Sequence, residues 1–343
     1  MVKSLLAKLA AVIATHALAE STNAGYASHV KSWLLFCLYF NHETLPATDA
    51  GLSQYLVFQA QSVSPGSLQT YLSGIRSFHL DNGYSWPHVS SRPQVSRTMR
   101  DLKRVFGVGP KKKFAITLEI LMAMRSHLDF TKPADVMWWA AALTAFYGCF
   151  RKDNVTVNKE SSFNSTANLS RGDFAPDSGS WESVFEGPLW VRARRSKTNQ
   201  SRATVHFVPL LPIPGSALCP VAAVVQAFAL SPSNNADSAP FYSVNSAGEF
   251  QPLSHQIFVR RTKELISAIG RNPDDYSGHS FRIGAATLSF KLTPRHELIK
   301  DLGDWASDAY LGYNRPDPNT KCLLPALMSL QAARVARACI SPS

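Results

Sequence analysis

One stretch of the chain, residues 134–150, limits the possible folds more than any other. Its residues are almost all apolar, and they include the neighbouring tryptophans Trp138 and Trp139. A helix that is apolar on all sides is stable only when other elements surround it. The sequence therefore predicts that this helix lies at the centre of a larger domain, and that both tryptophans are core residues.

The N-terminal third of the chain predicts a separate helical bundle. Its apolar residues recur at helical spacing in successive segments, and turn-forming residues such as Asp81, Asn82 and Gly83 separate them. We expect helices that begin at Ser21 or Thr22, at Thr48, at Ser64 and near Pro93. Residues 1–17 predict a further amphipathic helix rather than a signal peptide, because their apolar positions follow helical spacing.

The last helix of this bundle is strongly basic and leads into a basic linker. Between Arg92 and Lys113 there are eight positive residues and one acid, Asp101. Glycine, proline and three lysines make residues 107–113 a linker by composition. Such a helix and linker suit a clamp around duplex DNA, although an ordinary solvated surface explains the same pattern. The residues predicted to contact DNA here are Arg97, Arg100, Lys103, Arg104, Lys111, Lys112 and Lys113.

The overall charge indicates a polyanionic partner. The chain of 343 residues has 35 Lys and Arg against 24 Asp and Glu, a formal net charge of +11. No apolar run is long enough to span a bilayer, so we expect no membrane partner. The five cysteines are scattered and include no Cys-x-x-Cys pair, which predicts a reducing compartment without a disulfide framework or a zinc site.

Beyond the apolar helix the sequence predicts short strands. The expected strands are residues 169–174, 189–194 and 203–208. The turn between the last two contains Lys197, so a lysine lies near the tip of a predicted hairpin. Arg194 and Arg195 precede it and are further candidates for DNA contact. With the later helices, these elements predict a mainly α fold with a small β-sheet, of the α+β class.

Two motifs in the C-terminal part combine residues that suit chemistry on phosphate. His279 and Arg282 are three residues apart, so on a helix they share a face and can address one anion. Tyr310 and Tyr313 follow as candidate nucleophiles. Arg151, at the end of the apolar helix, must point to water or to an anion, because an unpaired buried guanidinium is costly. We find no paired carboxylates for a metal and no glycine-rich phosphate loop.

In order and spacing, these motifs resemble those of the tyrosine recombinases, the integrases of Cre, Xer and phage type. The resemblance lies in Arg151, the Ser-Lys197-Thr turn, His279-Ser-Phe-Arg282, and Leu302-Gly-Asp-Trp followed by Tyr313-Asn-Arg. A His-x-x-Arg pair alone is a weak signal, whereas the ordered set is a strong one. The residues of the last two motifs are most similar to those in recombinases of eukaryotic mobile elements of the Crypton and DIRS types.

The resemblance implies a two-domain architecture and its partners. A helical core-binding domain would occupy residues 1–106, a basic linker 107–113 and a catalytic domain 114–320. Residues 321–343 predict a tail helix that docks on a neighbouring subunit. The implied partners are a double-stranded DNA target site and further copies of the chain, with a dimer on one site and a tetramer in synapsis.

The resemblance also implies a role for each motif residue. Arg151 and Arg282 would bind nonbridging oxygens of a phosphodiester, and His279 would accept the proton of Tyr313 as its oxygen attacks phosphorus. Lys197 would protonate the leaving 5′ oxygen. The product would be a 3′-phosphotyrosine, and neither a metal nor ATP would be required.

The sequence departs from the family pattern at two positions. Nine residues before Tyr313, where the family usually has His or Trp, it has Asp304, whose carboxylate would repel phosphate. Either the adjacent Trp305 offers its indole N–H instead, or activity is impaired. Three residues after the first arginine, the usual acid is replaced by Asn154, so we expect Asp153 or the Asn154 carbonyl to orient that arginine.

Several alternatives stay open. Tyr310 competes with Tyr313, but its spacing from His279 is too short for the family, and we expect it to pack. A type IB topoisomerase uses nearly the same residues and would relax supercoils as a monomer. A DNA-binding protein descended from a recombinase is favoured by Asp304. A nuclear location, or otherwise the cytoplasm or nucleoid, rests on the family resemblance and on the lysine run 111–113.

Overall fold

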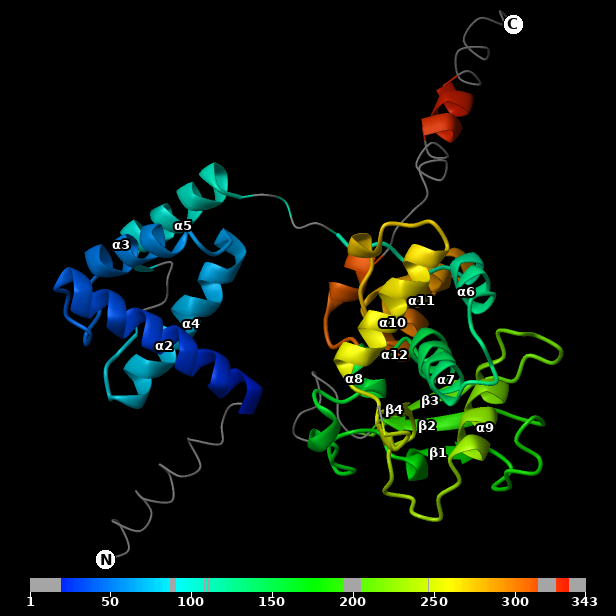
Figure 1. Ribbon diagram of the computed structural model, residues 1–343. Coiled ribbons are helices and arrows are strands. Elements are labelled where there is room, and N and C mark those ends of the chain that lie inside the picture. Colours follow the sequence, from blue (N-terminus) through cyan, green and yellow to red (C-terminus); the bar gives the residue numbers. More distant parts are fainter. Residues whose placement is uncertain are drawn as a thin grey trace, which may run out of the picture. The chain divides into compact units, whose positions relative to one another are not determined.

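The computed structural model describes residues 20–86, 91–107, 109, 112–193, 205–245, 247–313 and 325–332. The chain divides into two compact units, Met1–Lys111 and Lys112–Ser343, so the boundary lies within the predicted linker (Figure 1). Each unit has its own apolar core. Among the helices of the described ranges, none is long and apolar enough to cross a membrane. The predicted helix over residues 1–17 lies outside the described residues.

The first unit is a helical bundle. Its helices are α2 (Glu20–Phe40), α3 (Asp49–Gln59), α4 (Pro65–Asp81) and α5 (Pro93–Val105) (Figure 1). The Thr48 side chain caps α3 by accepting a hydrogen bond from the Gly51 amide, and prolines occupy the first turns of α4 and α5. Trp33, Tyr55 and Leu68 are fully buried between the helices. The bundle thus forms where apolar spacing and caps predict it.

Helix α5 has one buried face and one basic face. Val95, Met99 and Leu102 are buried at helical spacing. The predicted DNA contacts on this helix, Arg97, Arg100, Lys103 and Arg104, are all exposed. Asp101 approaches Arg97 at 3.8 Å, but both side chains are exposed, so this ion pair contributes little to stability. The face therefore presents several guanidinium and ammonium groups to solvent.

Helix α7 (Pro133–Tyr147) lies at the centre of the second unit, as its apolar sequence predicts. Every residue from Val136 to Phe146 is buried. The helix packs against α9 (Pro220–Leu230) and α11 (Ser280–Leu292). Trp138 Nε1 also donates a hydrogen bond to the Phe258 carbonyl of α10 (His255–Ala268) at 3.2 Å. The tryptophan pair is part of the core, as predicted.

A small antiparallel sheet follows α7 in the chain. Its strands, in the spatial order β1-β2-β3, are β1 (Phe174–Pro176), β2 (Leu189–Ala193) and β3 (His206–Leu210). In the β2–β3 pair, Val191 lies opposite Val208, and Ala193 lies opposite His206. Residues 194–204, which include the predicted turn, lie outside the described residues. The mainly helical fold with a small sheet is the predicted class.

The structure corrects part of the predicted strand pattern. Residues 170–173 form a turn rather than a strand, because the Asp173 carboxylate accepts hydrogen bonds from the Ser170 amide and hydroxyl. The first strand therefore begins only at Phe174. A second hairpin, β4 (Tyr242–Val244) with β5 (Phe250–Pro252), is not predicted by the sequence, since three-residue strands are too short for an alternating pattern.

Shorter elements complete the second unit. They are α6 (Leu118–Arg125), α8 (Lys152–Val155), α12 (His296–Leu302) and the 3-10 turns η2 (Glu160–Ser162), η3 (Arg171–Asp173), η4 (Pro273–Asp275) and η5 (Asp308–Tyr313). Within the predicted tail helix, residues 325–332 are described and helical, with Leu327, Met328 and Leu330 exposed. The rest of 321–343 lies outside the described residues.

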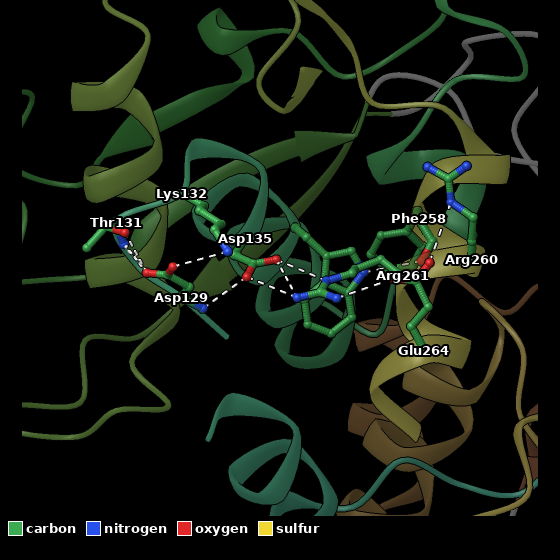
Figure 2. Close-up of polar contacts among 9 residues, drawn as sticks. Asp129, Thr131, Lys132, Asp135, Phe258, Arg260, Arg261 and Glu264 are labelled. Carbon is green, nitrogen blue, oxygen red and sulfur yellow. Dashed lines mark hydrogen bonds and ion pairs between the residues drawn. The ribbon is translucent and has the colours of Figure 1, made fainter. Parts of the chain in front are cut away.

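An ion pair ties the start of α7 to α10. Asp135 is buried in the first turn of α7, where a negative charge also suits the helix dipole. Arg261 donates to it through Nε and NH2, each at 3.0 Å, and the Asp129 amide donates at 2.9 Å (Figure 2). Glu264 approaches the other side of Arg261 at 3.2 Å from the solvent-exposed face.

Replacing Asp135 by alanine is expected to lower the free energy of unfolding by about 2 kcal/mol, because a half-buried amide and a bidentate guanidinium lose their acceptor. The matched change Glu264→Ala removes an exposed partner of the same arginine and should cost under about 0.5 kcal/mol. Urea denaturation followed by tryptophan fluorescence measures both. Equal losses in the two variants would contradict this account.

Candidate active site

The structure brings Tyr313 into contact with His279. Tyr313 ends the turn η5, and His279 immediately precedes α11. The His279 Nε2 atom lies 2.8 Å from the Tyr313 hydroxyl oxygen, at hydrogen-bonding distance. The Thr287 hydroxyl donates to the Tyr313 carbonyl at 2.9 Å, which fixes the backbone of the tyrosine on α11. A residue pair separated by 34 positions is thus held in one place.

The environment of His279 keeps its imidazole neutral. Burial lowers the pKa of His279 to about 4, and the positive charges of Arg282 and Arg151 contribute to this shift, whereas Asp153 opposes it. At neutral pH the ring therefore has one nitrogen that can accept a hydrogen bond. A neutral imidazole beside a phenol can receive the phenolic proton when the oxygen becomes a nucleophile.

Contacts within the protein hold the Arg282 side chain in place next to Tyr313. Arg282 is only 2% exposed. NH1 donates to the Cys149 carbonyl, and NH2 donates to the Gly303 carbonyl at 2.7 Å. The face of the Trp305 ring lies 3.9 Å from the guanidinium carbon, in a cation–π contact. The guanidinium is therefore fixed from three sides before any ligand binds.

The two carbonyls that hold Arg282 belong to unusual turns. Cys149 has a φ of 49° and Asp304 a φ of 50°, and non-glycine residues rarely adopt this left-handed conformation. Any side chain at Gly303 would also overlap the Trp305 ring. Strained backbone of this kind persists where the surroundings enforce it, and it is common at functional sites.

A small pocket lies beside this guanidinium. Its walls come from the turn after α7, from α8, from the ends of β2 and β3, and from the turn after α12. The charged or polar side chains on its walls include Arg151, Arg282, His206 and Asp304. Two guanidinium groups from distant parts of the sequence thus line one pocket, which favours an anionic ligand.

The predicted support for Arg151 is different in the structure. The Asn154 side-chain oxygen accepts a hydrogen bond from the Arg151 backbone amide at 3.0 Å, not from its guanidinium. Asp153 binds Lys152 and lies 3.0 Å from His255 Nε2. Asn154 therefore fixes the backbone of the arginine, while Asp153 links α8 to the start of α10.

The two aromatic residues Trp305 and Tyr310, which follow the turn after α12, make different contacts. Trp305 is buried, its ring centroid lies 5.4 Å from that of Tyr313, and its indole nitrogen has no partner among the described residues. Trp305 thus supports Arg282 with its ring face and is not part of the pocket wall. Tyr310 is buried and stacks on Phe290, with ring centroids 6.0 Å apart. Of the two tyrosines, Tyr313 is the one at His279.

Some predicted residues cannot be placed. Lys197, Arg194, Arg195 and Lys111 lie outside the described residues. Lys112 is exposed, and Lys113 donates to the Asp274 carbonyl within the second unit. His206 is a pocket residue that the sequence predictions do not include. Its signal was the alternation of residues 203–208, which puts it on the same face as Val208.

No protein family model matches the chain, and no curated protein matches it in sequence. Solved structures do match. The lambda integrase fragment 75–356, a dimer bound to a core site, has a TM-score of 0.54 at 14% identity, covering 91% of this chain and 95% of that one. The Tn1549 transposon integrase with transposon right end DNA has a TM-score of 0.53 at 11% identity, covering 84% and 86%. The XerH site-specific recombinase with its difH substrate has a TM-score of 0.50 at 14% identity, covering 81% and 70%. The chain therefore has the fold of the tyrosine recombinases.

Proposed function

We propose that the protein is a tyrosine recombinase, which binds duplex DNA and cleaves and rejoins its strands through Tyr313. The observation that carries this proposal is that Tyr313 contacts His279 and lies next to Arg282, which shares a pocket with Arg151. Similarity to integrases and recombinases that were solved with DNA supports the same reading. The resemblance of its motifs to Crypton and DIRS recombinases suggests a mobile element as the source.

The chemistry follows from these side chains. The Tyr313 oxygen attacks phosphorus, its proton passes to His279, and the bond from phosphorus to the 5′ oxygen breaks. Arg151 and Arg282 stabilise the negative charge that develops on the nonbridging oxygens. The leaving oxygen takes a proton from a general acid, for which Lys197 is the candidate. Attack by a 5′ hydroxyl on the phosphotyrosine reverses these steps and rejoins a strand.

We further propose that the protein acts on DNA as a homo-oligomer. Lambda integrase has been solved as a dimer on a core site and as a tetramer on a Holliday junction, with TM-scores of 0.54 and 0.53 to this chain. The exposed basic face of α5 would contact the phosphate backbone of the duplex.

A library of nicked duplexes of random sequence tests the proposed function, since the target site is unknown. Loss of the short nicked strand prevents rejoining, so a covalent protein–DNA adduct should accumulate and survive denaturation. We expect Tyr313→Phe to abolish the adduct and Tyr310→Phe to retain it, because only Tyr313 lies at His279. Tight binding of duplex without any adduct would instead favour a DNA-binding protein that has lost catalysis.

A further inference from the structure

We propose that His206 is an additional phosphate-binding residue of this site. Alternate residues of β3, Val208 and Leu210, are buried against the core, whereas Phe207 and Pro209 are exposed. His206 continues the inward row at the end where the strand reaches the pocket. The imidazole of His206 thus lies at a position where the alternating pattern of β3 predicts an apolar side chain.

The register of the sheet places a small side chain opposite His206. The residue opposite on β2 is Ala193, whose small side chain also lines the pocket. His206 Nε2 lies 3.4 Å from the Leu302 carbonyl, just before the turn that supports Arg282. This contact is long for a hydrogen bond, so it does not require the ring hydrogen on Nε2, and with the hydrogen on Nδ1 the ring can donate to a ligand.

The charges of the pocket explain why a further donor is useful. Arg282 donates from NH1 and NH2 to two backbone carbonyls, and Asp304 adds a carboxylate to the same wall. A phosphate that enters would therefore meet some repulsion from this carboxylate. A ring N–H of His206 would offset that repulsion by donating to a nonbridging oxygen from the β3 side.

Inorganic phosphate tests this binding without any strand cleavage. In the full chain with isotope-labelled histidine, assigned through His206→Gln, the His206 ring resonances should shift with added phosphate and reach saturation. The variant Arg151→Gln should weaken the apparent phosphate affinity severalfold, because the two groups share the pocket. The inference is overturned if phosphate does not shift the His206 resonances, whether or not it shifts those of His279.

Strand cleavage provides a second measurement, which rests on the proposed function. His206→Ala should slow adduct formation about tenfold to a hundredfold, the range of one charge-assisted hydrogen bond. The control Phe207→Ala alters the neighbouring residue on the outer face of β3 and should leave the rate unchanged. A His206→Ala rate equal to wild type overturns the role of His206 but leaves that of Tyr313 intact. If wild type forms no adduct, the proposed function fails, and the phosphate titration still decides on His206.

Discussion

Replacing Arg282 by lysine is expected to lower the rate of covalent adduct formation about a thousandfold. The guanidinium binds two backbone carbonyls and stacks on Trp305, and it must still face the phosphate. One ammonium group cannot reproduce this planar arrangement of donors, although it keeps the positive charge. Loss of a fixed donor to a developing oxyanion commonly lowers the rate a hundredfold to a thousandfold. In this variant the two turn carbonyls that bind the guanidinium also lose their donor. Single-turnover cleavage of a nicked duplex measures the effect.

The same substitution is also expected to destabilise the second unit, because two buried carbonyls lose a donor. Urea denaturation therefore accompanies the kinetics, and rates are compared at temperatures where both proteins are fully folded. Arg260→Lys is the matched control, since Arg260 lies exposed on α10, where it forms an ion pair with Glu264 at 3.7 Å. A folded Arg282→Lys protein that cleaves within tenfold of the wild-type rate would contradict the assignment of Arg282.

Much of the helical framework could be predicted from the sequence, because helices carry local signals. Thr48 caps α3, and the uniform apolarity of α7 predicts its central position. The spacing of His279, Arg282 and Tyr313 likewise selects residues that the structure brings together. These features depend on residue types within one helix or on a motif of fixed length.

The supports of the site could not be predicted, since they depend on contacts between distant segments. The carbonyls that hold Arg282 come from turns whose left-handed residues are Cys149 and Asp304. Cysteine gives no turn signal, and aspartate, although common in turns, does not by itself predict a left-handed residue. The unexpected acid at Asp304 is therefore part of a turn, and Trp305 contributes a ring face rather than a placed N–H donor. Backbone acceptors carry no sequence signature at all.

The largest effect on stability is expected from Gly284→Ala, in the middle of α11. A methyl group at this position would overlap the Ile116 carbonyl oxygen and press on the Phe146 ring. Ile116 donates its amide hydrogen to the Ser280 carbonyl at 3.0 Å, so the segment that leads into α6 lies directly on α11. Alanine normally favours helices over glycine, but here it forces two backbones apart within the core.

We expect Gly284→Ala to lower the free energy of unfolding by about 3 kcal/mol or more, and to reduce adduct formation, because α11 positions both His279 and Arg282. The matched control is Gly25→Ala in α2, where an added methyl group meets nothing within 4 Å. That change should stabilise the first unit by up to about 1 kcal/mol. Urea titrations of both variants distinguish the effect of helix propensity from that of close packing. A gain in stability at both positions would show that α11 tolerates a side chain at Gly284. It would also show that the contact between α11 and Ile116 does not fix the site.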